Sequence, residues 1–164
     1  MVERQFLIDQ FPFLEVLDYK AFVFQLKTSV SLAASIVYAD LPYKPGVYLV
    51  YDYTNNKLGN LLYVGKAGVD KDGKINTHQL PKRLLATINP QDNYRNHPNM
   101  PKSQDVTRNV AWPIMMEVDK IESIKIFCFY SKISNYKVDQ KNNPLNIEKQ
   151  IRKIVAAKPK WARK

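Results

Sequence analysis

The sequence is poor in the residues that build disulfide frameworks and transition-metal centres. Its 164 residues include one cysteine and two histidines. Cys128 can make no internal disulfide and no multi-cysteine metal site, and its place in the apolar run 126–129 predicts a buried thiol. His97 lies in a segment rich in proline and asparagine and is expected on the surface. No histidine–cysteine cluster therefore supports a zinc site.

Long apolar runs are also missing. No stretch approaches the roughly 20 residues that a membrane-spanning helix needs. Glu3, Arg4 and Asp9 interrupt the first ten residues, which argues against a secretory signal. The sequence is 45% hydrophobic and 12% aromatic, which is enough for one core, so we expect a single soluble, cytoplasmic domain over 1–164.

The charge is strongly basic, at +10 formally. The excess lies in two blocks, since 61–110 holds eight basic and four acidic residues and 137–164 holds nine basic and two acidic residues. Clustered lysine and arginine attract phosphates, so this distribution indicates a polyanionic partner. A solvated, solubilising surface is the alternative interpretation of charge alone.

The first half of the chain contains signals for a helix and a hairpin. Apolar residues at spacings of three and four predict one helix face, with Asp18 as N-cap, at Phe22, Leu26, Val30, Ala33 and Val37. Two β-rich runs follow, at 46–51 and 61–65, separated by turn residues at 55–60. They predict an antiparallel hairpin.

The second half predicts two helices and one strand. A helix is expected over 80–88, ended by Pro90, and 89–113 is expected to be mostly irregular. A strand is expected at 124–130, and Asn143-Pro144 predicts the start of a final helix. The pattern indicates an α+β fold with a small mixed or antiparallel sheet of about three strands flanked by helices, with an N-terminal helical extension over 1–42 and a core over 43–161.

Four short segments, in this order along the chain, resemble the GIY-YIG nuclease superfamily over about residues 45–161. They are Gly46-Val47-Tyr48, Tyr63-Val64-Gly65, Leu80-x-x-Arg83-Leu84 and Glu148-x-x-Ile151. The resemblance implies a metal-dependent DNA endonuclease, in which Glu148 binds one divalent cation, Mg²⁺, with Mn²⁺ as a substitute. One carboxylate with waters and phosphate oxygens is a common way to hold Mg²⁺.

The residues themselves fit phosphodiester hydrolysis, which needs a base, positive charge on the phosphate and a metal. Tyr48 and Tyr63 are both candidates for the base, and hairpin pairing could bring the two phenols to one face. A phenol has a pKa of about 10 and needs a nearby cation to act as a base at neutral pH. Lys66 and Arg83 could supply that charge, and a guanidinium suits the scissile phosphate. The alternative is that both tyrosines are ordinary strand aromatics.

The catalytic candidates are therefore Tyr48, Tyr63, Lys66, Arg83 and Glu148. The candidates for substrate binding are Gly65, Lys66, Lys74, His78, Lys82, Arg83 and Arg108. Gly65 could let substrate approach the backbone, or could serve a bulge or turn. For Lys74, His78 and Lys82, a solvated surface role is the favoured alternative. The segment 89–110, with its Asn, Gln and Arg residues, could reach base edges of double-stranded DNA.

Two positions depart from the family pattern. Thr87 stands where many members carry a titratable His or Tyr, and Ala162 stands where an Asn is frequent. The leading role is a small type II restriction endonuclease, for which a homodimer would match a two-fold DNA site. The alternatives are a structure-specific repair or mobile-element nuclease, and a catalytically silent nucleic-acid-binding module.

Overall fold

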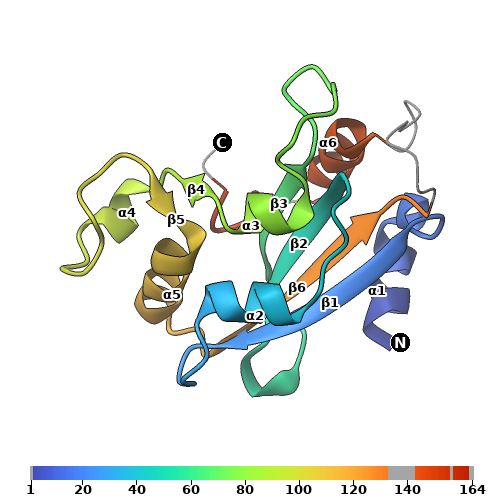
Figure 1. Cartoon of the computed structure of the whole chain (residues 1–164). Coiled ribbons are helices and arrows are strands. Elements are labelled where there is room, and N and C mark those ends of the chain that lie inside the picture. The colour runs from blue at the N-terminus through green and yellow to red at the C-terminus, as the bar shows by residue number, and fades with distance from the viewer. Residues whose placement is uncertain (1, 133–142, 156, 163–164) are drawn as a thin grey trace.

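The computed structural model describes residues 2–132, 143–155 and 157–162, and the chain alternates helices and strands throughout (Figure 1). The helices are α1 (Val2–Gln10), α2 (Leu32–Tyr38), α3 (Leu80–Leu84), α4 (Asp92–Arg95), α5 (Arg108–Asp119) and α6 (Pro144–Ile154), with short 3-10 turns η1 (Pro12–Leu14) and η2 (Thr54–Asn56). The strands are β1 (Asp18–Gln25), β2 (Gly46–Asp52), β3 (Leu61–Ala67), β4 (Thr87–Ile88), β5 (Val106–Thr107) and β6 (Ser123–Tyr130).

The main sheet has four strands in the order β1-β6-β2-β3, and every neighbouring pair is antiparallel. The expected α+β class and the hairpin are confirmed, since β2 and β3 pair from Gly46–Ala67 to Tyr51–Leu61 with one irregularity after Val50. The expected strand over 124–130 is also confirmed as β6. The expectation of about three strands was wrong by one, and β4 with β5 forms a second, two-stranded sheet.

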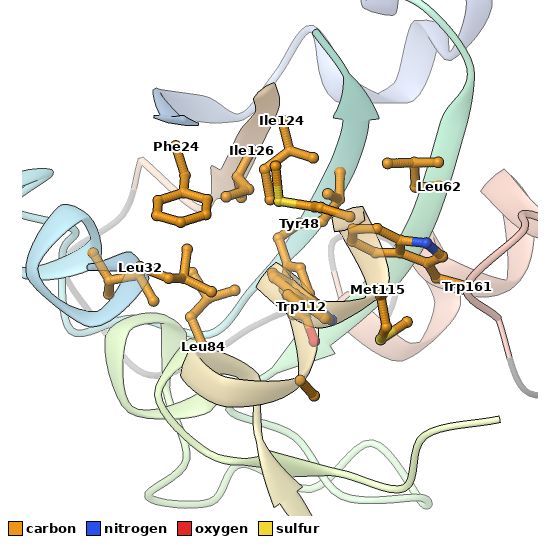
Figure 2. Close-up of a cluster of buried hydrophobic side chains, with 14 of the residues drawn as sticks. Phe24, Leu32, Tyr48, Leu62, Leu84, Trp112, Met115, Ile124, Ile126 and Trp161 are labelled. Atoms are coloured by element: carbon orange, nitrogen blue, oxygen red, sulfur yellow. The ribbon is translucent and has the colours of Figure 1, made fainter. Parts of the chain in front are cut away.

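Each face of the main sheet carries its own core because side chains alternate along a strand. On one face, Tyr48, Val50 and Ile126 pack with residues of α2, α3 and α5, as the buried side chains in Figure 2 show. On the other face, Val47 and Phe127 pack with residues of α1, η1 and α6. The central strand β2 is consequently buried on both sides.

The segment 1–42 does begin with a helix, α1, but the continuous helix that the apolar spacing from Phe22 predicts does not form. Asp18, expected as an N-cap, begins β1, which pairs with β6 over eight residues from Asp18–Tyr130 to Gln25–Ser123. The apolar residues of β1 alternate, with Phe22 and Phe24 on one face. Within the apolar stretch, a helix forms only from Leu32 onward as α2, where the Ser31 hydroxyl accepts a hydrogen bond from the Ala34 N–H at 3.0 Å. This segment therefore supplies an outer strand of the main sheet.

The segment 80–119 also differs from expectation. The helix expected over 80–88 ends at Leu84, and Thr87–Ile88 instead pairs with Val106–Thr107. The region expected to be irregular contains α4 and the start of α5, which continues through Pro113. The residues of α4 and the following segment project from the body of the protein (Figure 1). The Arg95 guanidinium supports this projection by donating to Asn89 Oδ1 at 2.7 Å and to the carbonyls of Pro101, Ser103 and Gln104.

The final helix confirms its predicted start. Asn143 is the N-cap of α6, and its side chain accepts from the Leu145 N–H at 2.9 Å. Beyond the helix, the Trp161 N–H donates to the Leu62 carbonyl at 2.8 Å, and Arg152 Nη2 donates to the Val64 carbonyl at 3.1 Å. The C-terminal part of the chain thus covers the outer edge of β3. Among the described helices, none is both long enough and apolar enough to cross a membrane.

Candidate active site

The two tyrosines of the motif lie side by side on one face of the hairpin. Tyr48 is opposite Gly65 and Tyr63 is opposite Val50, and the two phenol rings stack with centroids 5.9 Å apart. A Cβ on Gly65 would lie 2.2 Å from Tyr48 Cζ, far inside van der Waals contact. Gly65, which was expected to admit substrate or to serve a turn, therefore makes room for the ring of Tyr48.

Tyr48 is an interior residue. Its side chain is 0% exposed, and its hydroxyl accepts a hydrogen bond from Arg108 Nη2 at 2.9 Å. Burial raises the pKa of Tyr48 to about 12, although the positive charge of Arg108 acts in the opposite direction. Tyr48 is therefore a neutral phenol at physiological pH.

Tyr63 is only partly buried and lines an open pocket of about 310 Å³. Its ring meets the edge of Trp112, whose centroid is 6.1 Å away. Arg83, Arg108 and Arg152 line the same pocket. A phenol beside three guanidinium groups is thus placed where a small charged group can enter.

Arg108 connects the separate parts of this site. It is 0% exposed, and its guanidinium donates to the Arg83 carbonyl at 2.8 Å, to the Thr87 carbonyl at 3.3 Å and to the Tyr48 hydroxyl. It also lies 5.6 Å from the ring of Trp112. Both Nη groups are therefore engaged within the protein, which suits holding α3 against β2. A direct contact between Arg108 and substrate stays a prediction.

Arg83 is carried by the short helix α3, whose Leu80 and Leu84 are buried in the core while Arg83 is only partly buried. Its Nε is buried and has no hydrogen-bond partner within the described residues. Arg83 lines the pocket of Tyr63 and also a second pocket, of about 280 Å³, together with Lys66 and His78. The Arg83 side chain therefore borders both pockets, although its Nε is buried.

Glu148 reaches the site from the opposite face of the sheet. Ile147 and Ile151 anchor α6 in the core of that face, and Glu148 lies 3.8 Å from Arg152 Nη2 with 15% of its side chain exposed. Burial raises the pKa of Glu148, while the charges of Arg152, Lys66 and Arg83 act to lower it. Glu148 and Arg83 also act electrostatically on Tyr48. Glu148 lines neither pocket, and Arg152, which lines the pocket of Tyr63, is the residue that connects it to this site.

A desolvated carboxylate of this kind fits a hard divalent cation. Within the described residues, no group of three or more His, Cys, Asp or Glu side chains could hold an ion. An ion at Glu148 would therefore take most of its ligands from water and from phosphate oxygens, which is how Mg²⁺ is usually bound.

The remaining candidates for substrate binding are spread over the neighbouring surface. Lys74 and Lys82 are exposed and line neither pocket. The Lys74 N–H donates to Asp70 Oδ1 at 2.9 Å within the loop that follows β3. His78 is exposed on the rim of the second pocket. Of these three residues, His78 is the one that the structure brings beside Lys66 and Arg83.

The two departures from the family pattern have defined places. Thr87 is exposed on the wall of the Tyr63 pocket. Ala162 is buried, and its carbonyl accepts a hydrogen bond from Gln91 Nε2. The backbone of Ala162 therefore makes this contact with the segment after β4.

Sequence reasoning missed the support behind Tyr63. The Asp119 carboxylate is 5% exposed and accepts from the Tyr94 hydroxyl at 2.7 Å and from Trp161 Nε1 at 2.9 Å. Trp161 in turn packs on Trp112, with ring centroids 5.8 Å apart. A line of aromatic rings thus runs from Asp119 to Tyr63. Trp112 and Trp161 are visible in the sequence as aromatic residues, but nothing there indicates that their rings pack together.

No model of a known protein family matches this chain, and neither the characterised proteins nor the solved structures contain a match to it. The case for a function therefore stands on the residues and their geometry.

Proposed function

We propose that this protein is a metal-dependent DNA endonuclease of the GIY-YIG kind. The observation that supports the proposal most is that Tyr63, Arg83 and Arg152 line one pocket and that Glu148 lies 3.8 Å from Arg152. A phenol and an arginine that line one pocket, with a desolvated carboxylate nearby, fit the base, the positive charge and the metal ligand that phosphodiester hydrolysis needs.

Tyr63 is the base in this proposal, and Tyr48 supports it. Tyr63 lines the open pocket, whereas Tyr48 is buried, hydrogen-bonded to Arg108 and has a raised pKa. The Tyr63 hydroxyl passes its own proton to solvent and accepts a proton from water, the water oxygen forms a bond to phosphorus, and the bond from phosphorus to the leaving sugar oxygen breaks. That oxygen leaves with the electron pair and takes a proton from solvent.

Arg83 and Lys66 offset the negative charge that develops on the phosphate during this step. Glu148 is the protein ligand for one divalent cation, Mg²⁺ or Mn²⁺. The cation supplies polarisation of the phosphate and stabilises the leaving oxygen. The positive charges of Lys66, Arg83 and Arg152 lie near Glu148 and act to lower its pKa. Because these charges also repel a cation, we expect the cation to bind most tightly when a phosphate is present to neutralise them.

Double-stranded DNA is the proposed substrate, and a type II restriction enzyme is the proposed biological role. The projecting segment between α4 and β5 presents exposed residues at 101–105, including Lys102 and Gln104, that suit the phosphate backbone and base edges. Part of the second basic block, 137–142, lies outside the described residues. A homodimer would match a two-fold DNA site.

The test is incubation of the protein with supercoiled plasmid DNA and Mg²⁺, followed by electrophoresis. We expect discrete fragments, loss of cleavage with EDTA, and loss of cleavage in Glu148→Gln. Glu117→Gln is the matched control because Glu117 is 62% exposed on α5 and lines neither pocket. It should cleave as the unchanged protein does.

The pattern of products separates the alternatives. Smearing, or cutting restricted to branched DNA, would favour the structure-specific repair or mobile-element nuclease over the restriction enzyme. DNA binding without cleavage in any divalent metal would favour the silent binding module. Metal-dependent cleavage that survives in Glu148→Gln would contradict the proposed site.

A further inference from the structure

Arg83 lies between two pockets of similar size. The first, of about 310 Å³, contains Tyr63 and the proposed cleavage site. The second, of about 280 Å³, is formed by the end of β3 and the loop that follows it, and includes Lys66, Asp70 and His78. Of the residues that the structure describes, Arg83 alone lines both. The proposed chemistry needs the first pocket and takes Lys66 from the second, but it gives no role to His78 or to the space that His78 borders.

The wall of the second pocket is a built structure. The Gly68 N–H donates to the His78 carbonyl at 2.6 Å, and the Asn76 N–H donates to the Gly68 carbonyl at 2.9 Å. The Asn143 side chain donates to the Gly73 carbonyl at 2.8 Å, which ties the tip of this loop to the start of α6. The loop therefore holds His78 in a fixed place beside the end of β3.

The charge of the second pocket favours an anion. Lys66 and Arg83 are cations, and His78 adds hydrogen-bonding capacity at the exposed rim. Asp70 is the carboxylate of the pocket, and its Oδ1 accepts from the N–H groups of Asp72 and Lys74. These backbone hydrogen bonds, and then the charges of Lys74 and Lys66, hold the pKa of Asp70 below its usual value. The pocket thus holds two positive charges, on Lys66 and Arg83, and one negative charge, on Asp70, whose Oδ1 already accepts hydrogen bonds from its own loop.

We propose that this second pocket binds the phosphate adjacent to the scissile one, on the same DNA strand. The inference rests on the proposed function, because the scissile phosphate defines the first pocket. A guanidinium has five N–H donors in a planar fork, so Arg83 can contact two successive phosphates. The cleaved strand would then run from the Tyr63 pocket, across Arg83, to Lys66 and His78.

The test replaces single phosphates by neutral methylphosphonates in a synthetic duplex that contains the cleavage site found with plasmid DNA. We expect a neutral linkage at one of the two positions flanking the scissile phosphate to slow cleavage about tenfold or more, as the loss of one charge-assisted contact implies. In His78→Ala the native duplex is cut more slowly, and the same neutral linkage costs about threefold or less because the contact is already lost.

The other histidine provides the matched control. His97 lies 3.6 Å from Glu117 and lines neither pocket, so His97→Ala should keep the full sensitivity to the neutral linkage.

The outcomes distinguish the two proposals. If the unchanged protein leaves all native DNA uncut, the proposed function fails. The second phosphate site is wrong, and the nuclease proposal stands, if native DNA is cut but a neutral linkage at neither flanking position slows cleavage. The same holds if the neutral linkage slows cleavage equally in His78→Ala, His97→Ala and the unchanged protein.

Discussion

Gly65 carries no side chain because the ring of Tyr48 occupies that space, and alanine at this position should be costly. The added Cβ would lie 2.2 Å from Tyr48 Cζ and 2.3 Å from its hydroxyl oxygen. The Tyr48 ring must then move, which breaks its 2.9 Å hydrogen bond with Arg108. Overpacking costs about 1–3 kcal/mol, and a hydrogen bond to a charged group contributes about 1.5–3 kcal/mol. We expect Gly65→Ala to lower the free energy of unfolding by about 3–5 kcal/mol.

Urea denaturation in two backgrounds tests this explanation. In Tyr48→Ala the ring is absent, so Gly65→Ala should cost less than about 1 kcal/mol there. Gly59→Ala is the control, because a Cβ at that exposed glycine meets its nearest atoms at 3.3 Å. A cost in the unchanged protein below about 1 kcal/mol, or an equal cost in both backgrounds, would refute the reasoning.

Three further predictions concern buried groups of the site. The raised pKa of Tyr48, about 12, contributes stability that is fully present below the unfolded value near pH 10 and is lost as pH rises toward 12. Tyr48→Phe should therefore lose less stability than the unchanged protein between pH 10 and 12, as measured by urea denaturation. Burial raises the pKa of Glu148, so ionisation of this carboxyl at pH 7 opposes folding. Glu148→Gln, measured without metal, should therefore not lower the midpoint temperature of thermal unfolding. A clear fall in that midpoint would contradict the desolvation of Glu148. Asp119→Asn weakens the acceptor for Tyr94 and Trp161 and should destabilise the protein by about 1–3 kcal/mol, with a changed tryptophan fluorescence that an exposed control, Asp40→Asn, does not show.

The hairpin and the last helix could be predicted because their signals are local. The β-rich runs of β2 and β3 are separated by turn residues, and Asn143 followed by Pro144 marks a helix start whatever surrounds it. The face shared by Tyr48 and Tyr63 follows from the two-residue period of strands. These features depend little on distant parts of the chain.

The strand β1 and the helix α5 could not be predicted because distant contacts decide them. The apolar spacing from Phe22 onward fits a helix by coincidence, and β1 is selected by pairing with β6, about 100 residues away. The range 89–113 was expected to be mostly irregular, yet α5 begins at Arg108 and continues through Pro113 because its Trp112 and Met115 are buried in the core. Tertiary packing there outweighs the lost backbone hydrogen bond.

The site shows the same division. The motifs suggested the two tyrosines, Arg83 and Glu148 as candidates, but they gave no means of telling Tyr48 from Tyr63. That difference depends on Arg108, 60 residues from Tyr48, which enters the core and binds its hydroxyl. An arginine at the start of a helix that the sequence did not predict gave no signal of this contact.

The most direct test of the central claim is the single-turnover rate of plasmid cleavage, with Mg²⁺, for Tyr63→Phe and Tyr48→Phe compared side by side. If Tyr63 is the base, its phenol is indispensable, and Tyr63→Phe should lose at least about a hundredfold in rate. Tyr48→Phe keeps the buried ring and should retain cleavage within about tenfold of the unchanged protein. The reverse order, or equal rates in both variants, would contradict the assignment of Tyr63 as the group that activates water.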